Sequence, residues 1–95
     1  MQKHFELGKL VMTRGVADRL EESADFAAHV MRSLQRYTAY DWGDLCKEDA
    51  AMNDSAIGPN EDRIFAAYEH PEQPNVWIIT EADRSYSTIL FPSEY

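Results

Sequence analysis

The chain has 95 residues and a formal net charge of −8, with 9 basic side chains against 17 acidic ones. This length accommodates one small domain at 1–95, because two separate cores would each bury too little surface. The composition, 44% hydrophobic and 12% aromatic, is that of a folded protein rather than a disordered one. The acidic excess argues against direct contact with a nucleic-acid backbone or an anionic membrane surface.

The compartment is indicated by what the sequence lacks. No apolar run approaches the roughly 18–20 residues of a membrane-spanning helix, and the first residues lack the apolar core of a signal peptide. Cys46 is the single cysteine, which excludes an internal disulfide framework. We therefore expect a cytoplasmic protein in a reducing environment.

The negative charge is concentrated in one segment. Residues 1–40 carry six basic and five acidic side chains, and residues 63–95 carry two basic and five acidic ones. Residues 41–62 carry Lys47 alone against seven acids, namely Asp41, Asp44, Glu48, Asp49, Asp54, Glu61 and Asp62. This segment has two interpretations, a solvated surface that confers solubility or an acidic face that meets a basic partner.

The first half of the chain predicts a strand followed by two helices. Residues 5–13 alternate as a strand, with Gly8 at a phase shift typical of a bulge, so that Leu10 and Met12 continue the apolar side. Thr13 is expected to cap a helix at about 14–22, and Ser23 to cap a second helix with a carboxylate in its first turn. One apolar stripe follows the second helix at Phe26, Val30, Met31, Leu34 and Tyr37.

A turn at residues 41–45 separates the second helix from a shorter third one. Asp44 is expected to cap this helix, which runs from about residue 45 to 55. Side chains available for burial on it are Leu45, Met52 and Ala56 or Ile57. Residues 58–60, with glycine and proline in sequence, end it.

Three strands are then predicted at residues 63–69, 76–81 and 87–91. The order β-α-α-α-β-β-β predicts an α+β fold, with an antiparallel sheet and helices on one face. The first strand joins the sheet at an edge or beside the last strand, and the sequence leaves both placements open. The second sheet face is aromatic, with Phe65, Trp77 and Tyr86, and is expected to contact loops or a second copy in a homodimer.

Catalytic and metal-binding motifs are missing from the sequence. His4, His29 and His70 are isolated, and Cys46 has no companion at ligand spacing, so no metal site is predicted and His29 is interpreted as structural. The carboxylates after residue 41 lack the spacing of a calcium loop, and no nucleophile motif or phosphate-binding loop is present. We expect no catalytic residue, no cofactor and no enzymatic activity.

Two turns carry alternative interpretations. Trp42 is either a core anchor of the turn after the second helix or an exposed interface anchor surrounded by acids. The polar loop at 81–85 has a reactive-looking composition, but a structural interpretation is the stronger one. In it, Arg84 is expected to bridge Glu81 or Asp83 across a tight turn, and Ser85 to bond the backbone.

The segments FELGKLVMTRGV, DWGDL, DRIFAAYE and VWIITEADRSYSTILFPSEY, with Asp49 and Asn53, resemble a family of small plasmid- and phage-related proteins. The resemblance covers nearly the whole chain, and the pattern WIITEADRS…TIL.P.EY is its most specific part. The chain departs from the family in residues QRYTAY before Asp41 and in the proline-containing stretch at 57–60. The resemblance implies a mobile genetic element as habitat and one compact domain, but no activity, cofactor or site residue.

The charge pattern and this habitat together lead to a functional expectation. We expect a non-enzymatic protein that inhibits or modulates a basic, nucleic-acid-handling host protein, such as a nuclease or CRISPR effector, by partial DNA mimicry. The alternatives are a homo-oligomeric module whose acidity serves solubility, or a binder of a small ligand between protomers. The expected partner-binding residues are Asp41, Trp42, Asp44, Glu48, Asp49, Asp54, Glu61 and Asp62.

Overall fold

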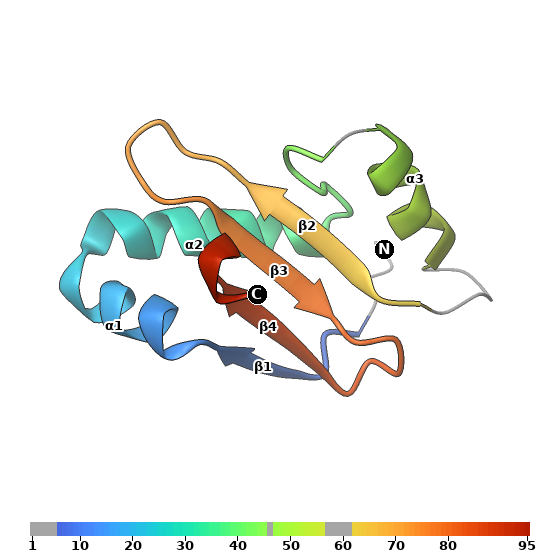
Figure 1. Cartoon of the computed structure of the whole chain (residues 1–95), viewed down its shortest axis with the longest axis horizontal. Helices are drawn as coiled ribbons and strands as arrows, with labels where there is room; N and C mark the ends of the chain where they lie inside the picture. The colour runs from blue at the N-terminus through green and yellow to red at the C-terminus, as the bar shows by residue number, and fades with distance from the viewer. Residues whose placement is uncertain (1–5, 46, 57–61) are drawn as a thin grey trace.

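The computed structural model describes residues 6–45, 47–56 and 62–95, which form three α-helices and a four-stranded sheet (Figure 1). The expected order β-α-α-α-β-β-β and the α+β fold class are confirmed. The elements are β1 (Lys9–Met12), α1 (Arg14–Glu22), α2 (Ala24–Thr38), α3 (Lys47–Ala56), β2 (Ile64–Tyr68), β3 (Val76–Thr80), β4 (Tyr86–Leu90) and the 3-10 turn η1 (Pro92–Glu94).

The strands are ordered β1-β4-β3-β2 across the sheet. β2, β3 and β4 form the expected antiparallel meander, with Phe65 opposite Ile79 and Ile78 opposite Ile89. β1 runs parallel to β4, so the expectation of a wholly antiparallel sheet is wrong. A parallel neighbour requires a crossover connection, and the helices that follow β1 supply it. β1 therefore lies both at an edge and beside the last strand.

Helices α1 and α2 cover one face of the sheet, as expected, whereas α3 lies along the β2 edge (Figure 1). The core between the helices and the sheet is one cluster. Its fully buried members are Val16, Phe26, Tyr37, Ile64, Ala66, Tyr68, Val76 and Ile78. Because α1, α2 and three strands all contribute to this cluster, the described elements form a single domain.

The three meander strands are buried to different degrees on their second face. β2 alternates strictly: Ile64, Ala66 and Tyr68 are buried in the core, and the residues between them are partly exposed. In β3 and β4 even the outward-facing Ile79 and Leu90 are only 5% exposed. This confirms that the second face is at least partly covered along these strands.

The helix caps of the N-terminal half form where they are expected. Thr13 Oγ1 accepts the N–H of Val16, and Ser23 Oγ accepts the N–H of Phe26 at 3.1 Å. Met31, however, is 57% exposed, so its assignment to the buried stripe is wrong. It lies five positions after Phe26, about 140° around the helix, which takes it away from the sheet.

A buried chain of hydroxyl groups crosses the core. Tyr37 Oη lies 2.7 Å from Thr80 Oγ1, which lies 2.7 Å from Ser87 Oγ. Ser87 Oγ in turn donates to the Leu7 carbonyl at 2.7 Å. Because Ser87 uses its own proton in that last bond, the Thr80 hydroxyl is the donor to Ser87. Tyr37 is therefore the donor in its bond with Thr80. The Tyr37 hydroxyl also lies 3.3 Å from a second acceptor, the Ile64 carbonyl. The chain joins α2, β3, β4 and the N-terminal segment.

Gly8 lies before β1 rather than inside a strand, so the predicted bulge at this position is wrong. Its φ is +65°, and a Cβ atom there would collide with the carbonyl oxygens of Arg84 and Ser85. Glycine is needed because the chain makes a left-handed turn directly against the β3–β4 connection. Leu10 and Met12 then pair with Ser87 and Ile89 but are 40% and 39% exposed at the sheet edge.

Candidate functional site

The acidic segment lies along the β2 edge of the sheet. Gly43 forms an isolated parallel bridge to Ala67 of β2, and α3 follows the same edge (Figure 1). We call the described acids of this segment the acidic edge: Asp41, Asp44, Glu48, Asp49, Asp54 and Asp62, all of them exposed. Glu61, which was expected to belong with them, lies outside the described residues, as do Cys46 and residues 57–60 of the predicted helix stop.

Asp41 stabilises the turn after α2. Its carboxylate accepts two hydrogen bonds from the Arg36 guanidinium, at 2.8 and 3.2 Å, and a third from the Gly43 N–H. The Asp41 carbonyl accepts the Tyr68 hydroxyl at 2.7 Å. Arg36 holds the pKa of Asp41 below its ordinary value. The negative charge of Asp41 is therefore offset by a neighbouring cation.

Trp42 is buried at 5% exposure, so the interpretation of Trp42 as an exposed interface anchor is wrong. Its ring packs edge-on against Tyr37, with centroids 5.5 Å apart. Its indole Nε1 donates to Asp54 Oδ1 at 2.9 Å. Trp42 thus serves as the core anchor of the turn and holds α3 against it.

Asp44 does not cap the third helix. Its carboxylate accepts the Glu69 N–H at 2.8 Å, just beyond the end of β2, and α3 begins at Lys47. The preceding Gly43 has a φ of +76°, and a Cβ there would collide with the Ala67 carbonyl. The close approach to β2 therefore directs Asp44 towards the sheet rather than towards the helix.

Helix α3 is docked by a buried side chain whose structural role was not predicted from the sequence. Asn53, 4% exposed, donates from its amide to the Phe65 carbonyl and accepts the Phe65 N–H at 3.1 Å. The amide thus satisfies the unpaired edge of β2 as a neighbouring strand would. An asparagine inside a short helix, where it has poor propensity, was the available signal.

The outward face of α3 combines acids with an exposed apolar side chain. Glu48 and Asp49 lie in its first turn, where the helix dipole favours carboxylates. Met52 lies four and three positions further on, on the same side of the helix, and is 68% exposed. The expectation that Met52 is buried is therefore wrong.

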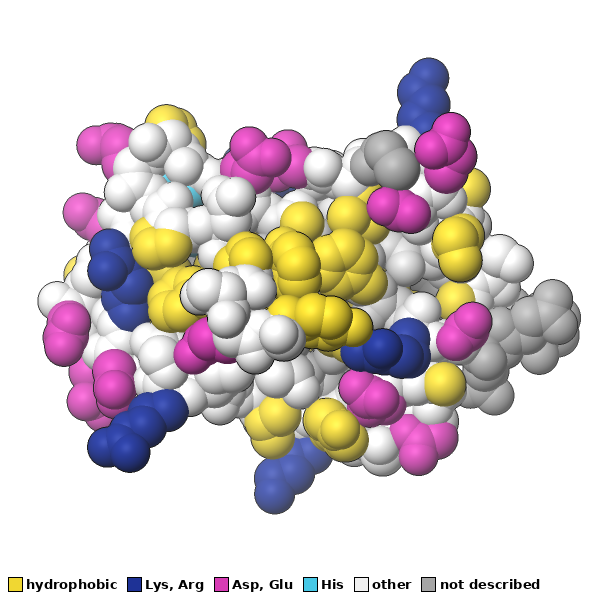
Figure 2. All heavy atoms as spheres, viewed as in Figure 1, with side chains coloured by type: hydrophobic (Ala, Val, Ile, Leu, Met, Phe, Trp, Pro, Cys, Tyr) yellow, Lys and Arg dark blue, Asp and Glu magenta, His cyan; other side chains and the backbone are white. Residues whose placement is uncertain are grey.

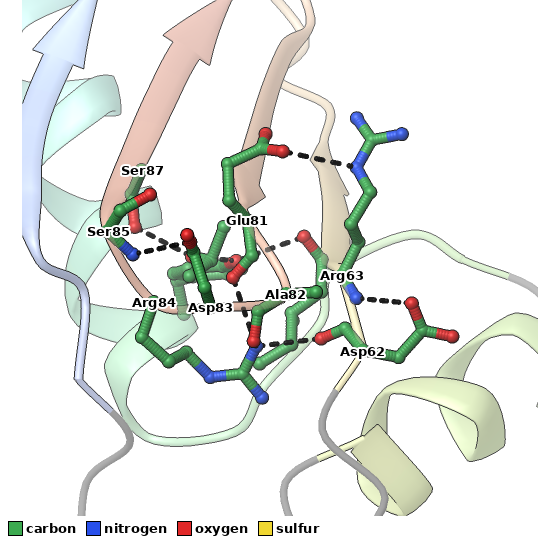
Figure 3. Close-up of polar contacts among 11 residues, drawn as sticks. Asp62, Arg63, Glu81, Ala82, Asp83, Arg84, Ser85 and Ser87 are labelled. Carbon is green, nitrogen blue, oxygen red and sulfur yellow. Dashed lines mark hydrogen bonds and ion pairs between the residues drawn. The ribbon is translucent and has the colours of Figure 1, made fainter.

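The far end of the acidic edge is held by Arg84 (Figure 3). Its guanidinium donates to the carbonyl oxygens of Asp62 at 2.7 Å and Ala56 at 2.8 Å, and to those of Glu81 and Ala82. The expected carboxylate bridge to Glu81 or Asp83 is thus replaced by carbonyl contacts. Arg84 connects the end of α3 to the β3–β4 turn, and its own φ is +60°.

Three carboxylates of the acidic edge accept hydrogen bonds from uncharged donors. Asp44 accepts from the Glu69 N–H, Asp54 from the Trp42 indole, and Asp62 from the Arg63 N–H. These bonds orient the carboxylates without removing their charge. Asp44, Asp54 and Asp62 consequently contribute oriented negative charges to the exposed edge.

Within the described ranges, no group of three or more His, Cys, Asp or Glu side chains is arranged to hold a metal ion. In the same part of the chain, no helix has the length and apolar character required to cross a membrane.

Comparisons with known proteins identify no relative of the chain. No family model, curated protein or solved structure matches the chain. The resemblance to plasmid- and phage-related proteins therefore stays a prediction.

Proposed function

We propose that the chain is a non-enzymatic binding protein of a mobile genetic element that inhibits or modulates a basic, nucleic-acid-handling host protein. The mode of action is of the anti-CRISPR or anti-restriction type, by partial DNA mimicry. The observation that carries the proposal is the acidic edge, six exposed carboxylates gathered along β2 and α3. The habitat comes from the resemblance described above.

The arrangement of the edge supports this function physically. Carboxylates held by hydrogen bonds imitate phosphate charge at little cost in side-chain ordering when a partner binds. A surface of one sign also accelerates association with a basic groove and makes that association sensitive to salt. Asp44, Asp54 and Asp62 each have such an orienting bond.

The proposal includes an apolar anchor. Since Trp42 is buried, Met52 replaces it as the exposed apolar group among the acids. Methionine is flexible and polarizable, and it adapts well to an irregular partner surface. Met52→Ser is expected to weaken binding without exposing a core position.

The test compares two charge-matched variants in capture from host lysate at about 0.05 M and about 0.5 M NaCl. Glu48→Gln with Asp49→Asn removes two charges from the acidic edge, and Glu21→Gln with Glu22→Gln removes two from exposed positions of α1. We expect the first pair to lose the captured protein and the second to keep it. Duplex DNA should compete with the chain for that protein.

Three results would contradict the proposal. Capture that is equally strong at both salt concentrations would exclude charge mimicry as the basis of binding. Equal loss with both variant pairs would show that only net charge matters. A captured protein that does not bind nucleic acid would remove the inhibitory role.

The outer face of the sheet favours a second candidate, a homo-oligomeric module. Figure 2 shows hydrophobic side chains gathered over the middle of this face. Trp77 stacks edge-on with Phe65 at 4.9 Å and with the 73% exposed Tyr95 at 5.6 Å between centroids. With Ile79 and Arg63 they line a cavity of about 290 Å³. Sedimentation equilibrium decides: a dimer dissociated by Phe65→Ser supports this candidate, and a strict monomer excludes it.

A further inference from the structure

The two edge strands of the sheet, β1 and β2, differ in what covers their outer backbone groups. The outer side of β2 is occupied by Asn53, which bonds both backbone groups of Phe65, and by the isolated bridge between Gly43 and Ala67. β1 pairs with β4 on one side, and among the described residues no strand lies on its other side (Figure 1). A strand edge with unpaired N–H and C=O groups is able to pair with a strand of another chain.

The hydrogen bonds of β1 show which groups its open side presents. The N–H groups of Lys9 and Thr13 donate to carbonyls of β4 and of the turn before it, at 3.1 and 3.0 Å. Because backbone groups alternate in direction along a strand, those of Leu10 and Met12 point to the open side, which we call the β1 edge. The side chains of Leu10 and Met12 are 40% and 39% exposed. Strand β1 has no proline, and its only charged residue is Lys9 at its first position, so the edge lacks most of the usual protection against pairing.

The β1 edge is complementary to a second copy of itself. When two β1 strands run antiparallel with Val11 on the twofold axis, Leu10 of each copy lies opposite Met12 of the other. Both outward-pointing residues then exchange their N–H···O=C bonds across the axis. Any other antiparallel register that aligns the outward groups pairs one of the two residues with a position beyond the strand. The backbone geometry therefore favours one arrangement of two copies.

The charges beside the β1 edge fit the same register. It sets Lys9 of one copy opposite Thr13 of the other, with their Cβ atoms about 4.5–5.5 Å apart. Thr13 Oγ1 donates to Glu94 Oε1 at 2.6 Å, and the Phe91 N–H donates to the same oxygen at 2.9 Å. These bonds hold the Glu94 carboxylate beside Thr13, so the exposed Lys9 of one copy comes near the Glu94 carboxylate of the other. The twofold axis makes this contact twice.

We propose that the chain forms a twofold-symmetric dimer in which the β1 edges of two copies pair antiparallel and join two four-stranded sheets into one. This dimer uses a different surface from the outer sheet face considered above. Because β2 lies at the far edge of each sheet, the two acidic edges lie at opposite ends of the joined sheet, which limits repulsion between two chains of net charge −8. Both acidic edges stay accessible, so the dimer is independent of the function proposed above.

Sedimentation equilibrium of the full chain measures the dimer, and a disulfide locates its interface. In the proposed register Val11 lies opposite Val11 of the other copy in a non-hydrogen-bonded pair, with Cα atoms about 4.5 Å apart, which a disulfide spans. Val11→Cys in a Cys46→Ser background, which removes the single native cysteine, is expected to form a covalent dimer on oxidation with diamide. Thr88→Cys in the same background is the matched control. Thr88 pairs with Val11 on β4, one strand further from the axis, and its variant should stay monomeric in a denaturing gel.

A second pair of variants tests the backbone pairing. Leu10→Pro removes an N–H that points outward, and proline is tolerated at the open side of an edge strand. We expect it to raise the dissociation constant of the dimer at least about tenfold, because each copy loses a backbone donor at the interface. Phe65→Ser, on the opposite edge strand, should leave the dimer intact. Thermal unfolding of each variant verifies that the domain remains folded.

Several results would overturn the proposal. A strict monomer in sedimentation would exclude the dimer. No covalent dimer with Val11→Cys, or equal amounts with Thr88→Cys, would exclude the register. A dimer that Phe65→Ser dissociates would place the contact on the outer face of the sheet, and a folded Leu10→Pro variant with unchanged dimerisation would exclude backbone pairing. None of these measurements involves a host protein, so they leave the test of the proposed function separate.

Discussion

Asn53 illustrates at the residue scale how one side chain connects two elements. Its amide bonds both backbone groups of Phe65, and it is buried between α3 and β2. No apolar periodicity marks it, because the interaction depends on hydrogen-bonding geometry rather than on hydrophobic burial. Its sequence signal was limited to a poor helix former in the middle of a short helix.

Replacing Asn53 tests this role. Asn53→Ala leaves the Phe65 N–H and carbonyl without partners, and we expect the free energy of unfolding to fall by about 2–4 kcal/mol. Ser55→Ala, an exposed change two positions away, should alter it by less than about 0.5 kcal/mol. Urea denaturation measures both. Equal effects of the two substitutions would show that Asn53 does not dock the helix.

His29 makes a second residue-scale prediction, on pH. Burial, and then the neighbouring His70, lower the pKa of His29 below its ordinary value of 6.5. The unfolded chain therefore binds the proton at a higher pH than the folded chain. The His29 contribution to stability is complete above pH 6.5 and is lost as the pH falls from there through the lowered folded-state pKa. The charged or titratable groups near it are Asp25, Arg32, Arg36, His70 and Glu72.

The measurement is the thermal unfolding midpoint of the wild type and of His29→Phe between about pH 4.5 and about pH 7.5. This interval extends about two pH units below and about one unit above the ordinary pKa of histidine. We expect the wild type to lose more stability than the variant as the pH falls. Parallel curves would contradict the assignment, because every other titratable group is the same in both proteins.

At the scale of elements, the buried hydroxyl chain shows how α2, β3 and β4 are joined. Tyr37, Thr80 and Ser87 come from three different elements, and each hydroxyl lies 2.7 Å from the next. Thr80 and Ser87 are fully buried in a core whose side chains are mostly apolar. The sequence alone indicates only that Thr80 and Ser87 lie within strands. Their mutual satisfaction follows from the register that sets Thr80 opposite Ser87.

Thr80→Val tests this chain, because it removes the hydroxyl while keeping the shape of the side chain. We expect a loss of about 1–3 kcal/mol in the free energy of unfolding, since Tyr37 and Ser87 both lose a partner. Thr88→Val, on the partly exposed face of the adjacent strand, is the matched control and should change stability by less than about 0.5 kcal/mol. An equal, small effect of both substitutions would mean that the buried hydroxyl chain contributes little to the free energy of unfolding.

At the scale of the whole molecule, charge opposes folding. The net charge is −8, and the radius of gyration is 13.0 Å. At 0.01 M salt the Debye length is about 30 Å, so most acidic side chains lie within one Debye length of one another. We expect the thermal midpoint to rise between about 0.01 M and about 0.3 M NaCl as this self-repulsion is screened. A midpoint that falls with salt would show that attractive pairs such as Arg36–Asp41 dominate instead.

The candidate site was predictable in outline but not in detail. Asp41, Asp44 and Asp54 were singled out by charge density, which is a property of sequence. Their hydrogen-bond partners were not predictable, because Arg36, Glu69 and Trp42 are brought to them by the turn and by β2. Trp42 is buried, which is one of the two interpretations that the sequence left open, whereas Met52, expected to be available for burial, is exposed.

The sequence by itself determined the order of the elements, the caps at Thr13 and Ser23 and the segment that carries the charge. These features depend on neighbours within a few positions, where periodicity and capping chemistry are sufficient. Only the tertiary structure decided the parallel pairing of β1 with β4, the Arg84 carbonyl contacts and the packing of His29 against His70. Each of these joins residues distant in the chain, and their contacts depend on how the helices and the sheet pack together.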